Sequence, residues 1–199
     1  MGWVYESTRN QNRYAWSWNS ANAQNNAWQM YYELYATSKM TLEALCGIIG
    51  NICCEGLLNP WQEQVYQEGH IPEDENDRGY GLIQWTPQSS LTSLYGIYAT
   101  GEEQTQLIYD EIMGVVSGRF YPSVSHPEYS YSGQEFCQLT DVEEAAKAYF
   151  YERERGTWTD LRKTRGLYYY EVVFQGEPPI PPVPPQYRKM PLWMYLRRL

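Results

Sequence analysis

The most regular hydrophobic pattern in the chain lies between residues 42 and 55. Apolar residues recur there at the spacing of an α-helix: Leu42, Leu45, Ile48, Ile49, Ile52 and Cys53. Thr41 precedes the run as an N-cap residue, and Pro60 prevents the helix from continuing. Gly56 suits the left-handed position that closes a helix. The pattern predicts a buried helix that ends at Glu55.

Other segments have a weaker helical pattern. They span residues 20–37, 88–98, 102–117, 141–154 and 160–174. Thr140 and Glu143 form a capping box before the fourth of these segments. Strand-like patches at 64–66 and 80–84 predict a small β-wing, and residues 118–135 are expected to be irregular. The fold class is therefore mainly α (α+β).

Both ends differ from this body. Residues 1–19 form a polar N-terminal arm with three tryptophans and no steady period, and we expect it to order against another surface. From residue 176 the chain is proline-rich, which predicts an extended spacer, and residues 187–199 are apolar and cationic. We divide the chain into an arm (1–19), a catalytic domain (20–175) and a tail (176–199).

The tail permits more than one interpretation. A disordered terminus is one. We favour a peptide that docks on a partner, because large apolar residues rarely occur on a free tail. A membrane-surface anchor is a weaker option, since the segment is short and Pro191 interrupts it.

Composition limits the classes of function. A net charge of −9 argues against nucleic-acid binding, because no basic face would neutralise phosphates. The 20 Tyr and 8 Trp suit sugar stacking, although core and interface roles are more common for any one aromatic residue. We expect no secretory signal, because residues 1–9 lack a cationic region followed by an apolar one, and we expect no membrane span.

The cysteines and histidines do not form a convincing site. Cys46, Cys53, Cys54 and Cys137 lack a disulfide framework, so we expect reduced thiols. A nucleophile at Cys53 or Cys54 with His70 or His126 is disfavoured, because a helix C-terminus opposes the thiolate. The spacings also lack a zinc pattern. We expect neither a metal site nor a cofactor, and two solvated histidines.

Glu55 is the strongest candidate for catalysis. A single carboxyl placed against apolar side chains at a helix C-terminus is expected to keep its proton, because desolvation and the helix dipole both disfavour the anion. A general acid that works near neutral pH needs this property. Taken alone, the residue is better interpreted as a solvated glutamate at a helix end.

Two motifs around Glu55 carry a resemblance to a known family. Residues 50–60 read GNICCEGLLNP and residues 79–87 read GYGLIQWTP. They resemble the phage tail lysozyme family, whose pattern is G-N-x-x-x-E-S-x-x-N-P and then G-[YF]-G-L-x-Q-W-T-P. Gly56 replaces the usual Ser. A weaker third match is AYFYER at residues 148–153, so the resemblance covers roughly residues 20–175.

The resemblance implies a lysozyme-like fold and cleavage of peptidoglycan. It implies that Glu55 is the catalytic acid and that Gln84 lines the cleft, with Tyr80, Trp85 and Asn59 as further substrate-binding residues. Glu152 and Arg153 are interpreted as a structural ion pair that supports the cleft. The order of motifs also resembles soluble lytic transglycosylases.

The second carboxylate has several candidates between the two motifs. Asp77 is nearest the expected β-wing and is our choice, although the acidic run 73–77 is more typical of a solvated loop. A hydrolase needs such a group at about 5–9.5 Å from the acid, depending on its stereochemistry. A transglycosylase needs none, because the substrate's own hydroxyl attacks.

Together these observations predict a peptidoglycan glycosidase carried in a phage tail. We expect it to be made in the host cytoplasm, and to contact other tail proteins through its arm and its C-terminal tail. The alternative of another class is a tail structural protein that keeps the fold without activity.

Overall fold

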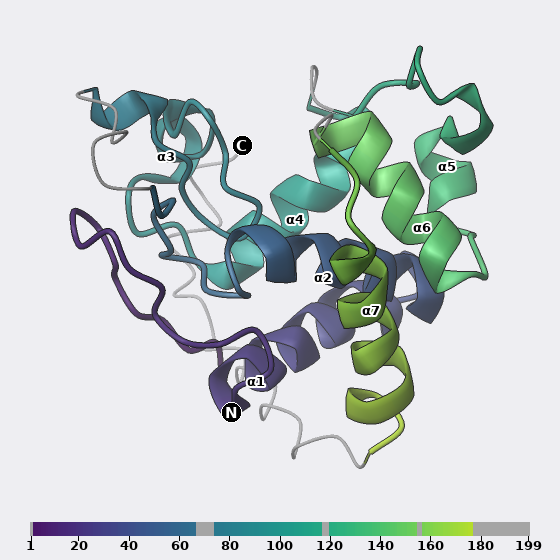
Figure 1. The fold of residues 1–199 in the computed structure, drawn as a ribbon, viewed down its shortest axis with the longest axis horizontal. Helices are drawn as coiled ribbons and strands as arrows, with labels where there is room; N and C mark the ends of the chain where they lie inside the picture. Colours follow the sequence, from purple (N-terminus) through teal and green to yellow (C-terminus); the bar gives the residue numbers. More distant parts are fainter. Residues whose placement is uncertain (1, 67–73, 117–119, 155–156, 177–199) are drawn as a thin grey trace, which may run out of the picture.

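Helices dominate the computed structural model, which describes residues 2–66, 74–116, 120–154 and 157–176 (Figure 1). The α-helices are α1 (Ala21–Met30), α2 (Leu42–Glu55), α3 (Ser89–Tyr95), α4 (Gly101–Ile112), α5 (Gly133–Phe136), α6 (Val142–Tyr149) and α7 (Asp160–Tyr168). The π-helical turns η1 (Tyr31–Tyr35), η4 (Phe150–Glu154) and η5 (Tyr169–Val173) directly continue α1, α6 and α7. Two 3-10 turns, η2 (Glu75–Asp77) and η3 (Pro127–Tyr129), lie in the loops. The mainly α fold class is confirmed.

Helix α2 lies at the centre of the fold, with α6 and α7 packed along it (Figure 1). The helix is buried on all sides from residue 44 to residue 53, so its central turns form the core. Two glycines permit this packing. A Cβ on Gly47 would lie 2.6 Å from the Cβ of Ala145 in α6, and a Cβ on Gly50 would overlap the carbonyl oxygen of Arg162 in α7. The neighbouring backbones therefore approach α2 more closely than any side chain would allow.

The predicted N-cap residue is correct for α2 but not for α6. Thr41 caps α2 as predicted, since its hydroxyl accepts from the backbone N–H of Ala44 at 3.1 Å. In α6 the cap is Asp141, which accepts from the N–H of Glu144 at 2.8 Å. The capping box predicted from Thr140 is therefore wrong: a single cap by Asp141 takes its place one residue later, because the aspartate competes for the same role.

The loop-rich segments 56–66 and 74–88 lie on one side of α2, opposite α5 and α6 (Figure 1). The β-wing expected there is reduced to isolated antiparallel bridges, Glu63 with Tyr80 and Tyr80 with Trp85. No strand forms in the described residues. Gly81 (φ 88°) and Gln84 (φ 51°) have left-handed backbones, which turn the chain back before a strand develops.

The N-terminal arm orders against the body of the same chain. Trp3 is buried, and its indole Nε1 donates to Glu33 at 3.0 Å. The indole of Trp16 donates to the carbonyl of Leu57 at 2.8 Å, and Trp18 packs against α7. The tryptophans that suggested a surface for a partner are therefore engaged within the domain.

Within the described ranges, no helix combines the length and the apolar character needed to cross a membrane. Residues 177–199, which hold the proline-rich spacer and the C-terminal peptide, lie outside the described residues. The docking of this tail stays a prediction.

Candidate active site

Glu55 is the last residue of α2, where the helix meets the loop-rich segment. Its side chain is 26% exposed, so a ligand can reach the carboxyl from solvent. Asn51 lies one turn earlier on the same face of the helix, as the four-residue spacing requires.

Arg162 of α7 is the direct partner of Glu55. Its Nη2 donates to Oε1 of Glu55 at 2.7 Å, and the arginine side chain is only 11% exposed. The expectation of a carboxyl placed against apolar side chains is therefore wrong. A charge-assisted hydrogen bond in this partly buried place fixes the carboxyl more firmly than an exposed ion pair would.

Arg162 is itself held from two sides. Its Nη1 donates to Oδ1 of Asn51 at 3.2 Å, and the guanidinium carbon lies 4.6 Å from the ring centroid of Phe150. Asn51 is fully buried, and its amide donates to the carbonyls of Gly47 (2.9 Å) and Ala146 (3.0 Å). The amide therefore ties α2 to α6 while its oxygen anchors the arginine from α7.

The cysteines beside Glu55 do not act as nucleophiles in this arrangement. Burial raises the pKa of the Cys53 thiol strongly. Burial also raises the pKa of Cys54, although the neighbouring guanidinium of Arg165 opposes the shift. Thiolates are therefore disfavoured, as expected, and Cys46 and Cys137 are also free and buried. Among the described residues, no group of three or more His, Cys, Asp or Glu side chains is placed to hold a metal ion.

Gly56 has a structural role different from the one predicted. Its φ of −102° is not left-handed, and the chain turns instead at Leu57 (φ 52°) and Leu58 (φ 59°). A Cβ on Gly56 would overlap the carbonyl oxygens of Gly81 and Leu82. The missing side chain therefore lets the second motif lie directly against the end of the helix that carries Glu55.

Three of the side chains assigned to substrate are buried and bonded within the chain. The hydroxyl of Tyr80 donates to the carbonyl of Ile97 at 2.7 Å, and the indole of Trp85 donates to Glu111 at 3.0 Å. The side chain of Asn59 bonds to the backbone of the N-terminal arm. These three side chains shape the loops and offer no exposed polar atom to a glycan.

Gln84 is buried in the turn of the second motif. Its Nε2 donates to the carbonyls of Gln62 (3.0 Å) and Gly81 (2.8 Å), which holds the turn closed. Its Oε1 is buried and has no hydrogen-bond partner among the described residues. The role of Gln84 in lining the cleft stays a prediction.

Asp77 ends the short turn η2 and is exposed. Within the described residues, no hydrogen bond or ion pair joins it to Glu55. The next residue, Arg78, forms an ion pair with the buried Glu63 at 3.7 Å. Two other carboxylates between the motifs, Glu68 and Glu73, lie outside the described residues.

In the third matching segment, residues 148–153 (the late motif), Glu152 and Arg153 do not pair with each other as expected. Arg153 donates to Glu111 of α4 at 3.2 Å, whereas Glu152 is buried and accepts from the backbone N–H of Tyr131 at 2.8 Å. The expected ion pair is wrong, because consecutive residues of a helical turn point in different directions. Burial raises the pKa of Glu152 to about 7, although the Tyr131 N–H opposes the shift.

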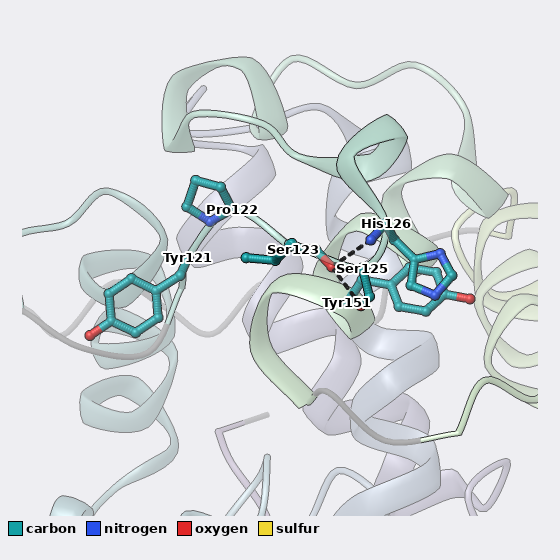
Figure 2. A pocket seen from close by; sticks show the side chains of 7 residues that line it. Tyr121, Pro122, Ser123, Ser125, His126 and Tyr151 are labelled. Carbon is teal, nitrogen blue, oxygen red and sulfur yellow. Dashed lines mark hydrogen bonds between the residues drawn. The ribbon is translucent and has the colours of Figure 1, made fainter.

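A hollow of about 590 Å³ lies beside Tyr151, near the start of η4, and Figure 2 shows its walls. Its lining residues are Tyr121, Pro122, Ser123, Val124, Ser125, His126 and Tyr151. The rings of His126 and Tyr151 stack with centroids 3.8 Å apart, so this histidine is not simply solvated. Tyr151 follows Phe150, whose ring packs on Arg162. Hydroxyls, an imidazole and aromatic rings suit a polar, uncharged ligand.

Sequence reasoning found Glu55 but missed Arg162. The available signal was a set of cations, Arg162, Lys163 and Arg165, on one turn of a helix in an acidic chain. One comparison with known proteins bears on this arrangement. A family model described as phage tail lysozyme matches residues 25–172. The match starts within α1 and ends within η5, so it includes Glu55, Arg162 and the hollow.

Proposed function

The chain belongs to the phage tail lysozyme family, and from this premise we propose that it is a peptidoglycan glycosidase of the phage tail. The bond cleaved is the β-1,4 linkage between N-acetylmuramic acid and N-acetylglucosamine, at the start of infection. The single observation that supports this most directly is the carboxyl of Glu55. It is accessible, and it ends a rigid buried helix that holds it in place.

Glu55 is the general acid in this proposal. Its proton passes to the glycosidic oxygen as the bond between that oxygen and C1 of muramic acid breaks, and the bonding electrons stay with the oxygen. Water then supplies a hydroxyl to C1. The remaining proton of that water goes to a second carboxylate, for which the exposed Asp77 is our candidate.

The glycan needs a surface beside Glu55. The hollow around Tyr151 and His126 is our candidate for this surface, because its aromatic rings and hydroxyls suit a sugar. The Tyr151 ring also lies 5.2 Å from the Phe150 ring that covers Arg162. The unpartnered Oε1 of Gln84 is a further candidate contact with sugar.

A tail structural protein without activity is the second candidate. The observation that favours it is the contact between Arg162 and Glu55, which occupies one oxygen of the proposed acid. A lytic transglycosylase is the third, and it is favoured because no hydrogen bond or ion pair joins Asp77 to Glu55 within the described residues.

Zymography on purified peptidoglycan distinguishes an active glycosidase from a tail structural protein without activity. We expect the wild-type chain to clear the substrate and Glu55→Gln to lose at least about a hundredfold in rate. Glu43→Gln is the matched control, because it changes the same residue type at the opposite end of α2. A Glu55→Gln variant as active as this control would exclude Glu55 as the acid.

The ends of the products identify the mechanism. Mass spectrometry of digested sacculi should find reducing muramic acid ends, and Asp77→Asn should slow their formation. Exclusive 1,6-anhydro ends would contradict hydrolysis and favour a transglycosylase on the same fold.

A further inference from the structure

The guanidinium of Arg162 bonds to two residues of one helix with its two terminal nitrogens. Nη1 reaches Asn51 at 3.2 Å and Nη2 reaches Glu55 at 2.7 Å. Because Asn51 and Glu55 lie one turn apart on the same face of α2, a planar fork spans both at once. Phe150 covers the guanidinium, so its orientation is fixed in three directions.

Only one oxygen of Glu55 is engaged in this way. Arg162 donates to Oε1, and among the described residues no hydrogen bond to Oε2 is found. The side chain of Glu55 is more exposed (26%) than that of Arg162 (11%). The arginine therefore lies on the inner side of the carboxyl, and Oε2 is the oxygen left for a ligand.

We propose that Arg162 is the positioning residue for Glu55: it holds Oε1 so that Oε2 carries the proton toward the glycosidic oxygen. This inference rests on the function proposed above and deepens it. Arg162 acts through Glu55 and does not touch the glycan.

The contact between Arg162 and Glu55 becomes stronger during the proposed reaction, in which Glu55 begins protonated. A protonated carboxyl can accept the Nη2 hydrogen bond at Oε1 while Oε2 bears the proton. As that proton moves to the glycosidic oxygen, negative charge develops on the carboxyl only 2.7 Å from a fixed cation. An interaction that is stronger in the transition state than in the ground state accelerates the chemical step.

Two residues of the first motif make this arrangement possible. Gly50 lets the backbone of α7 approach α2 at Arg162, because any Cβ there would overlap the Arg162 carbonyl oxygen. Asn51 supplies the second anchor and is buried itself. The first motif thus brings together the acid, its arginine and the close helix contact that joins them.

Steady-state kinetics on soluble, uncrosslinked glycan strands test the inference. We expect Arg162→Gln to lower kcat by about a hundredfold with KM changed little, because misplacing a catalytic group by about 1 Å has an effect of that size. Arg162→Lys should recover part of the lost kcat, since it keeps the charge but loses the fork.

Arg165 provides the matched control. It lies on the same helix and donates from Nη1 to the carbonyl of Cys53, so it contacts the same end of α2 without bonding to Glu55. Arg165→Gln and Arg165→Lys should lower the unfolding temperature as the Arg162 variants do, and should leave kcat near the wild-type value. Unfolding temperatures measured on every variant identify those that are folded at the assay temperature.

The outcomes distinguish this inference from the function it rests on. A wild-type chain without glycan cleavage would overturn both. An active wild type with an unchanged kcat in Arg162→Gln would overturn the positioning role alone. A rise in KM at constant kcat would make Arg162 a substrate contact, and an equal loss of kcat in the Arg165 controls would reduce the effect to helix packing. Either result would also overturn the inference.

Discussion

Arg153 donates to Oε2 of Glu111 at 3.2 Å, while Oε1 of the same glutamate accepts from the indole of Trp85 at 3.0 Å. The side chains of Arg153 and Glu111 are 9% and 5% exposed, so their ion pair is almost completely buried from solvent. Through Glu111 in α4, the turn of the second motif is joined to the late motif in η4. Two segments far apart in sequence thus share one buried carboxylate, which fixes both of them against α4.

Gly50→Ala should lower both stability and activity. The added methyl group would overlap the backbone of Arg162, which cannot move without shifting α7, and such overpacking costs about 2–3 kcal/mol. Because the shift also draws Arg162 from Glu55, kcat should fall in protein that is still folded. Gly2→Ala is the control, since a Cβ there meets nothing within 4 Å. Equal unfolding temperatures for the two variants would contradict the close contact between α2 at Gly50 and α7 at Arg162.

Stability should fall as pH rises from about 4.5 to about 7. Burial raises the pKa of Glu152 to about 7, from an ordinary value of 4.5. Between these values the folded chain holds a proton that the unfolded chain has lost, so rising pH favours unfolding, by up to about 3 kcal/mol for this group. Burial also raises the pKa of Glu33 to about 7, and Glu33 adds to the same trend.

Glu152→Gln isolates the share of Glu152 in this pH dependence. Urea unfolding at a series of pH values should show a flatter profile for the variant and a higher stability than wild type at pH 8. The amide oxygen can still accept from the N–H of Tyr131, so the packing is kept. A variant that follows the wild-type profile would show that folding does not raise the pKa of Glu152.

Trp3→Ala should destabilise the domain by about 3 kcal/mol, as truncation of a buried aromatic residue does. The Trp3 ring occupies the space over Gly101 and its indole bonds to Glu33. Tyr14→Ala is the control in the same arm, because that side chain is 51% exposed. Thermal unfolding of both variants is the measurement, and a Trp3→Ala midpoint equal to that of Tyr14→Ala would mean that the arm is separable from the body.

The parts of the fold that sequence predicted well are those governed by local rules. The 3.6-residue period placed α2, and the Thr41 hydroxyl caps it by a contact across three residues. The prediction of a β-wing was wrong because the chain turns back at Gln84, whose backbone is left-handed. The residue type gives only a weak preference for that conformation.

The site was predictable only in part, for a similar reason. Glu55 stands out because it ends an apolar helix next to a motif. Arg162 lies 107 residues later, and its pairing depends on how α7 crosses α2. A motif also does not reveal whether its polar atoms face a ligand or the backbone. Tyr80 and Asn59 were assigned to the glycan, yet both hold loops from inside the core.

Deletion of residues 177–199 should spare activity on isolated peptidoglycan and prevent incorporation into phage particles. The last large anchor of the described body is Phe174, whose ring packs against Trp28 (4.9 Å) and Tyr31 (5.2 Å) and is untouched by the deletion. The removed segment carries Leu192 and Trp193, which we expect to be buried by a partner chain. Zymography and particle composition, measured on the same deletion variant, thus test the deletion.

A second test compares hydrogen exchange in the last dozen residues between free and assembled protein. Equal exchange in both states would mean that the tail makes no contact in the particle, and the docking prediction would then be wrong.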